Sequence, residues 1–212
     1  TVEENKKDLM KLLIKVGRIQ YYICSYIFVG FVLVGKQFIV RWVGSGYSYC
    51  YLIAIVLMFP QIFSIIQSLF ATMLEAMNMH RVKAYIYLSV AILNVIISIL
   101  LVRQYQGMGC AIGTAIGMVI NAVANNFYYK YVIKLDIKSF WVQMLKLVIP
   151  TSITFIAGFF ALRLFSLTSY GSILMFGVLF TIIFFIVFWL LGFNKFEKKI
   201  FISALKMRRI KQ

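Results

Sequence analysis

The sequence predicts an all-α protein that crosses a membrane six times. Hydrophobic residues make up 63% of its 212 residues and aromatic residues 17%, which is more apolar surface than a water-soluble domain of this length can bury. The apolar residues gather in six long runs, each near the roughly 20 residues with which a helix crosses the hydrocarbon layer. Lysine and arginine crowd into every second gap between the runs, as expected for the cytoplasmic loops of a membrane protein.

Helices are favoured over barrel strands because each run is apolar on all sides and longer than the about 10 residues of a membrane strand. The gaps between the runs are too short to hold a separate soluble domain. The six predicted spans cover residues 16–35, 47–74, 84–103, 108–132, 144–165 and 170–192, followed by a basic tail at 193–212. We therefore expect one six-helix transmembrane lobe.

The ends of the spans carry recognisable signals. Leucines among lysines predict an amphipathic approach helix over 1–15, and residues 36–43 are expected to form an interfacial segment closed by the turn Gly44-Ser45-Gly46. Aromatic residues at the headgroup level predict one interfacial belt after the first span and a second belt between spans four and five. The first belt comprises Trp42, Tyr47, Tyr49 and Tyr51, and the second comprises Tyr128, Tyr129, Tyr131, Phe140 and Trp141.

Two prolines fall within spans. Pro60 lies in the middle of the second span, where its missing N–H and its ring should kink the helix, and Pro150 lies early in the fifth. A fixed packing bend and a bend that changes during transport are both open interpretations.

The fourth span carries a small-residue motif. Gly109, Gly113 and Gly117 recur at every fourth residue, which predicts close packing against a neighbouring helix. Asn121 and Asn125 continue the row, but it drifts by about 40° per step around the helix. The two asparagines are therefore open to two interpretations, namely helix packing and the lining of a hydrated cavity.

The distribution of charge predicts the orientation. Of 22 Lys and Arg residues, all but Lys36, Arg41, Arg103 and Arg163 lie on the side that includes both termini. The positive-inside rule therefore places both termini in the cytoplasm. The net charge of +16 is better explained by topology and by contact with anionic membrane lipids than by a nucleic-acid partner.

The inventory of reactive side chains argues against an enzyme. His80 is the single histidine, the six acids are scattered, and the three cysteines fit no metal-binding or paired spacing. We expect neither a metal nor another cofactor. Glu75, near the end of the second span, is interpreted as an interfacial carboxylate close to Arg81, with proton or sodium coupling as the alternative.

The polar residues within the spans are neutral or cationic, which suits a water-filled cavity that receives an anion. These candidate substrate-binding residues are Arg18, Gln20, Gln61, Gln67, Asn94, Asn121, Asn125 and Lys146. For Arg18 and Lys146, extension of the side chain to the inner headgroups is the alternative.

Three segments resemble the second half of Wzx-type polysaccharide flippases of the multidrug/oligosaccharidyl-lipid/polysaccharide exporter superfamily. They are LEAMNMHR at 74–81, AILNVIIS at 91–98 and GMGCAIGTA at 107–115, in which Cys110 replaces a more usual Ala. The resemblance extends from the turn at Gly44 to the sixth span. It indicates the superfamily, but it does not indicate which substrate is transported.

The resemblance implies a C-terminal lobe of a two-lobe exporter in the bacterial plasma membrane. Such proteins move an undecaprenyl-pyrophosphate-linked oligosaccharide outward for surface polysaccharides such as O-antigen or capsule. The first lobe would come from the same chain or from a second copy. The alternatives are a multidrug or peptidoglycan-precursor exporter of the same superfamily, and a membrane scaffold subunit that transports nothing.

Overall fold

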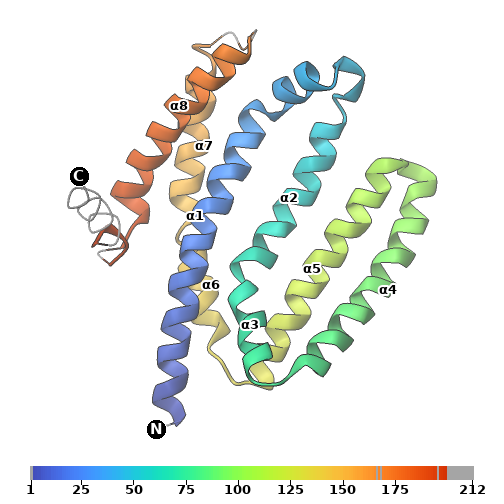
Figure 1. Cartoon of the computed structure of the whole chain (residues 1–212), viewed down its shortest axis with the longest axis vertical. Helices are drawn as coiled ribbons and strands as arrows, with labels where there is room; N and C mark the ends of the chain where they lie inside the picture. Colours follow the sequence, from blue (N-terminus) through green and yellow to red (C-terminus); the bar gives the residue numbers. More distant parts are fainter. Residues whose placement is uncertain (1, 166, 168, 195, 200–212) are drawn as a thin grey trace, which may run out of the picture. The chain divides into compact units, whose positions relative to one another are not determined.

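The computed structural model describes residues 2–165, 167, 169–194 and 196–199, and it confirms the all-α fold (Figure 1). Most of the predicted tail at 193–212 thus lies outside the described residues. In chain order the helices are α1 (Val2–Trp42), the 3-10 turn η1 (Ser45–Tyr47), α2 (Cys50–Ile66), α3 (Ser68–Ala76), α4 (His80–Tyr105), α5 (Gly107–Tyr131), α6 (Ile137–Leu145), α7 (Val148–Leu162), α8 (Tyr170–Val187) and the π-helical turn η2 (Phe188–Gly192).

Six stretches of the described chain are long and apolar enough to cross a membrane. They are Lys6–Trp42, Ser45–Ile66, Arg81–Tyr105, Gly107–Tyr131, Ile137–Leu162 and Tyr170–Gly192. The third, fourth and sixth agree closely with the predicted limits, whereas the first extends further at both ends, the second ends earlier and the fifth begins earlier than predicted. The protein is therefore a multi-pass membrane protein. Its helices divide into two compact units, residues 1–145 and residues 146–212, and the expected single lobe stays a prediction.

The first helix is longer than predicted. α1 has 41 residues, about 60 Å at the usual rise, and joins the approach segment, the first span and nearly all of the expected interfacial segment into one helix. Residues 36–42 thus form the last turns of α1, and their expected position at the interface stays a prediction. The turn after it does form, because Gly44 adopts a φ of 113°, a conformation open mainly to glycine, and η1 follows at once.

The second predicted span consists of two helices. α2 continues through Pro60 to Ile66, and the break comes at Gln67, where φ is −98° and ψ is 1°. There the backbone N–H of Phe70 donates to the carbonyl of Gln67, a tighter i to i+3 contact that starts α3. This break was not predictable from the residue type, since glutamine is a good helix former.

The glycine row on α5 packs against α4, as predicted. A Cβ on Gly109 would collide with the backbone at Leu101 and Val102, and one on Gly117 would lie 3.1 Å from Cβ of Asn94. The α4 and α5 backbones approach this closely only because glycine has no side chain. The α4–α5 hairpin is visible beside α2 in Figure 1.

The core of the first unit lies where α1, α3, α5 and α6 meet. The ring of Phe70 stacks on Tyr129 and meets Phe140 edge-on, with both pairs of ring centroids 4.9 Å apart. Tyr129 is 2% exposed and Phe140 is 0% exposed, so both belong to this core and not to the interfacial belt that we expected. The core forms because each ring buries a large apolar surface against its neighbours.

The second unit pairs α7 with α8. Ser169 caps α8 by accepting from the N–H of Gly171, with Ser172 completing a capping box. Along α8 and η2, phenylalanines recur at every fourth residue and contact one another in sequence, ending with ring centroids 4.2 Å apart between Phe184 and Phe188.

Candidate functional site

A polar cavity opens in the first unit among α2, α3, α4 and α5. Its volume is about 270 Å³, equal to the liquid volume of roughly nine water molecules. It is lined by Ser64, Gln67, Ser68, Ala71, Thr72, Glu75, Lys83, Tyr87, Asn121, Ala122, Asn125 and Tyr129. All of these except the two alanines carry a polar side-chain group. Because polar groups are costly within a membrane, this concentration marks the cavity as the candidate functional site.

Gln67 enters the cavity wall at the break between α2 and α3. Its side chain is buried, with the residue 6% exposed, and Nε2 donates to Oδ1 of Asn126 on α5 over 2.7 Å. The indole N–H of Trp141 on α6 donates to the same oxygen over 3.2 Å. One acceptor thus ties the helix break to two other helices and holds Gln67 in place.

Two asparagines one turn apart on α5 form the facing wall. Nδ2 of Asn125 donates to the backbone carbonyl of Asn121 over 2.8 Å and to its side-chain Oδ1 over 3.1 Å. Asn125 is buried, and Tyr129 continues the same face one turn later. The i, i+4 spacing therefore places three polar side chains along one side of the cavity.

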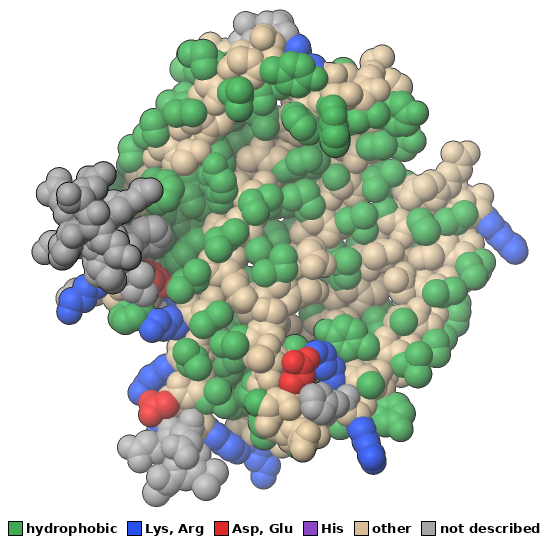
Figure 2. All heavy atoms as spheres, viewed as in Figure 1, with side chains coloured by type: hydrophobic (Ala, Val, Ile, Leu, Met, Phe, Trp, Pro, Cys, Tyr) green, Lys and Arg blue, Asp and Glu red, His purple; other side chains and the backbone are tan. Residues whose placement is uncertain are grey.

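An ion pair between α3 and α4 lines the cavity as well. Asn78 adopts a left-handed φ of 61°, which ends α3 and turns the chain toward α4. The turn brings Nζ of Lys83 onto Oε1 of Glu75, whose side chain is 46% exposed. Figure 2 shows red acidic side chains next to blue basic ones in the lower part of the face in view. The sequence had not indicated Lys83 as a partner of Glu75, and the expected closeness of Glu75 to Arg81 stays a prediction.

α1 reaches the cavity through Gln20. Its Nε2 donates to Oγ of Ser68 over 2.8 Å, and Ser68 lines the cavity. Oε1 of Gln20 is buried, and no group in the described part of the chain donates to it. This leaves an unsatisfied acceptor next to the cavity wall.

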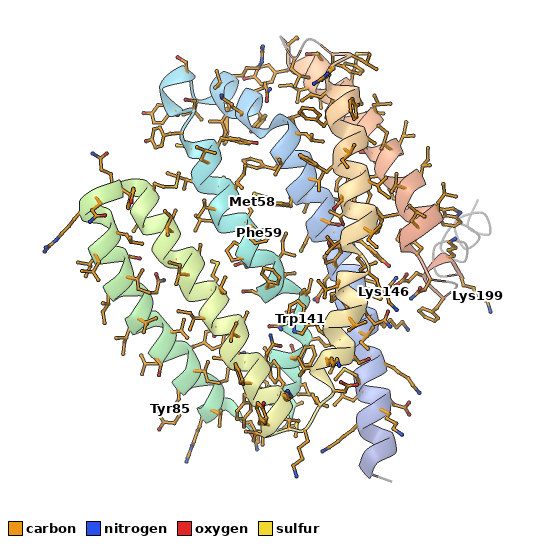
Figure 3. All side chains as sticks on the ribbon, turned by 180° about the vertical axis from the view of Figure 1, so that it is seen from behind. Met58, Phe59, Tyr85, Trp141, Lys146 and Lys199 are labelled. Atoms are coloured by element: carbon orange, nitrogen blue, oxygen red, sulfur yellow. The ribbon has the colours of Figure 1, made fainter. Side chains whose placement is uncertain are left out.

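Apolar grooves flank α5. One, of about 470 Å³, lies between α2 and α5 and includes Phe59, Pro60 and Ile120. The other, of about 370 Å³, lies between α4 and α5 and includes Tyr85 and again Ile120. Figure 3 shows Phe59 on α2 and Tyr85 on α4, with α5 passing between these two helices.

The structure brings together part of the predicted set. Gln67, Asn121 and Asn125 line the cavity, and Gln20 is one hydrogen bond away from it. Asn94 packs against Gly117 and accepts from Ser98 at the α4–α5 contact, while Gln61 is exposed on α2 outside the cavity.

The two predicted cations are not among the residues that line this cavity. Arg18 is buried on α1 and donates from Nη2 to the hydroxyl of Tyr22 over 2.7 Å. It is two positions before Gln20, about 200° around the helix, so these two side chains leave α1 in different directions. Lys146 is exposed at the start of the second unit. Their predicted contact with an anion stays a prediction.

Sequence reasoning missed Asn126, which holds Gln67, and Lys83, which pairs with Glu75. Asn126 directly follows Asn125, but adjacent residues on a helix point in different directions, so the sequence could not indicate that both serve one site. Among the described residues no group of three His, Cys, Asp or Glu side chains is placed to hold a metal ion, and Cys24, Cys50 and Cys110 are free thiols.

Comparison with protein-family models, with curated proteins and with solved structures finds no match to this chain.

Proposed function

We propose that this chain forms one lobe of a flippase that carries a lipid-linked oligosaccharide across a bacterial plasma membrane for surface polysaccharide synthesis. The observation that carries the proposal is the cavity lined by amides and hydroxyls inside a set of apolar helices. Amides and hydroxyls can hydrogen-bond a hydrophilic headgroup. Without such a ligand, placing them within the membrane would lower the stability of the protein. The local resemblance to the polysaccharide flippases supports the same class.

The substrate of such a protein has an apolar chain and a polar head. The grooves on either side of α5 are almost wholly apolar, and Ile120 lines both of them. They offer the prenyl chain a surface like that of the bilayer, while the head occupies the polar cavity. The cavity of about 270 Å³ is large enough for one sugar ring with its hydration, so this lobe would bind part of the head at a time.

The proposed orientation follows from the charges. With both termini cytoplasmic, the α3–α4 turn with Glu75 and Lys83 faces the cytoplasm. The cavity would then open toward the leaflet in which the substrate is made. A first lobe, from the same polypeptide or from a second copy, completes the path.

Two other classes of protein are distinguished by the cavity. A scaffold subunit has no need of it, because a helix interface is built from packing alone. An exporter of cationic drugs would favour a surplus of acidic groups, whereas here the Glu75 carboxylate is matched by Lys83. A peptidoglycan-precursor exporter handles the same chemistry of prenyl chain, pyrophosphate and sugar, and it differs from the proposal only in the glycan.

Export by the full-length protein tests the proposal. Cells that lack the protein are complemented with wild type, Asn125→Leu or the control Gln61→Leu, and lipid-linked glycan exposed on the outer leaflet is measured with an impermeant lectin or antibody. We expect at least about a tenfold loss of exposure for Asn125→Leu at matched protein level, and no loss for Gln61→Leu. Normal exposure in cells without the protein would refute the flippase function.

A further inference from the structure

The hydrogen bonds around the cavity fix which end of each amide faces it. An indole N–H can only donate, so the atom of Asn126 that Trp141 contacts has to be an oxygen. Gln67 contacts that same oxygen, so Gln67 has to present its Nε2 there. The oxygen of the Gln67 amide, Oε1, is the atom that is left over.

The same reasoning applies on α5. A backbone carbonyl can only accept, so the atom of Asn125 at the carbonyl of Asn121 has to be Nδ2. That nitrogen also contacts the side chain of Asn121, which therefore presents Oδ1 to it. Oδ1 of Asn125 and Nδ2 of Asn121 are the atoms left over.

The cavity therefore offers two fixed acceptors and one fixed donor. No hydrogen bond within the described chain engages Oε1 of Gln67, Oδ1 of Asn125 or Nδ2 of Asn121, and all three residues line the cavity. The remaining wall adds hydroxyls that can donate or accept. The nearby Oε1 of Gln20 is a further acceptor that no described group satisfies.

We propose that this cavity binds sugar hydroxyl groups and rejects phosphate. Each hydroxyl donates and accepts, so it satisfies both kinds of fixed amide atom, whereas an anionic phosphate only accepts and meets the negative ends of two carbonyl dipoles. Lys83 adds no surplus positive charge, because it pairs with Glu75. The inference rests on the proposed function and deepens it, since it assigns to this cavity the glycan and not the pyrophosphate of the substrate.

The test measures what the cavity admits and does not depend on transport. In full-length protein with Cys24, Cys50 and Cys110 replaced by alanine, a single cysteine is introduced by Thr72→Cys in the cavity wall. Its modification rate in nanodiscs is measured with three methanethiosulfonate reagents: a neutral glucosyl, an anionic sulfonate and a cationic trimethylammonium reagent. Each rate is divided by that of a reference cysteine from Ser45→Cys, an exposed residue of η1.

We expect the glucosyl reagent to react at least about fivefold faster than the sulfonate at position 72 after this correction, which corresponds to ~1 kcal/mol, the size of one hydrogen bond. Gln67→Leu should reduce this preference toward the reference value by removing a fixed acceptor. Gln61→Leu, the same substitution on the exposed side of α2, should leave it unchanged.

A sulfonate rate equal to or above the glucosyl rate would overturn the inference in favour of a phosphate site. A trimethylammonium rate above both would overturn it in favour of a cation site. Protection of the cysteine from all three reagents would also refute it, because the cavity would then be closed to polar ligands. If the preference holds while outer-leaflet export proves independent of the protein, the flippase function fails and the sugar-selective cavity stands.

Discussion

Gly113 of α5 lies directly against Ser98 of α4, so that a Cβ at position 113 would be 2.9 Å from Cα of Ser98 and would collide with its Oγ. Gly113→Ala should therefore push the two helices apart and cost about 1–3 kcal/mol of stability, and Gly113→Leu should abolish the folded yield. The loss of stability is measured as a decrease in the temperature at which detergent-solubilised protein loses its monodisperse elution peak.

Gly177 provides the control, because it also lies within a helix but a Cβ there would meet nothing within 4 Å. Gly177→Ala should leave stability unchanged or raise it slightly, since alanine is the better helix former. Equal effects of alanine at 113 and 177 would show that the α4–α5 contact does not depend on glycine.

The shared acceptor on Asn126 should couple three helices energetically. Asn126→Leu leaves the donors of Gln67 and Trp141 unsatisfied and should cost about 1–3 kcal/mol, whereas Trp141→Phe removes one donor and should cost about 1 kcal/mol. Because the two changes remove the same bond, their combination should fall short of the sum by about 0.5–1.5 kcal/mol. Additive effects on denaturant unfolding would mean that Trp141 does not orient Asn126.

Much of the architecture could be predicted because its causes are local. A run of about 20 apolar residues is sufficient to indicate a span, and the i+4 recurrence of Gly109, Gly113 and Gly117 is sufficient to indicate a close helix contact. The break at Gln67 was not predictable from local sequence, and the acceptor that holds the Gln67 side chain, Asn126, lies 59 residues further along the chain.

Part of the candidate site was also predictable, because some of its residues form a local sequence pattern. Asn121 and Asn125 could be identified as polar residues on one helix face, but nothing in the sequence separates Gln67, which lines the cavity, from Gln61, which does not. Tyr129 and Phe140 were placed at the interface because aromatic residues near span ends favour both belts and cores. Both rings contact Phe70 and therefore belong to the core. These contacts exist only in the folded chain, so the sequence could not indicate them.

The orientation can be tested with single cysteines in intact cells. Lys134→Cys should react with an impermeant maleimide only after the cytoplasm is opened, and Ser45→Cys should react from outside. Both positions are exposed, so accessibility does not limit either reaction. Labelling of position 45 from the cytoplasm alone would reverse the topology and place the α3–α4 turn outside.

Arg18 is the predicted partner of the substrate pyrophosphate. Arg18→Gln in the full-length protein should abolish export at unchanged abundance, and Arg18→Lys should retain part of it because the charge remains but the bidentate guanidinium does not. The control variant Arg103→Gln removes a positive charge from the last turn of α4, at the end of that helix that is far from Lys83. This variant should export normally. Full export by Arg18→Gln would exclude a role in substrate binding and leave Lys146 as the next candidate.

Photocrosslinking in living cells shows whether the glycan passes through the polar cavity. A photoreactive amino acid is placed at Thr72, which lines the cavity, or at Gln61, which is exposed on α2 outside it. We expect a protein–glycan adduct from position 72, detected with a lectin or antibody, that disappears when synthesis of the lipid-linked glycan is blocked. We expect no such adduct from position 61. Equal adducts at both positions, or none at position 72 in a variant that still exports, would mean that the glycan does not pass through this cavity.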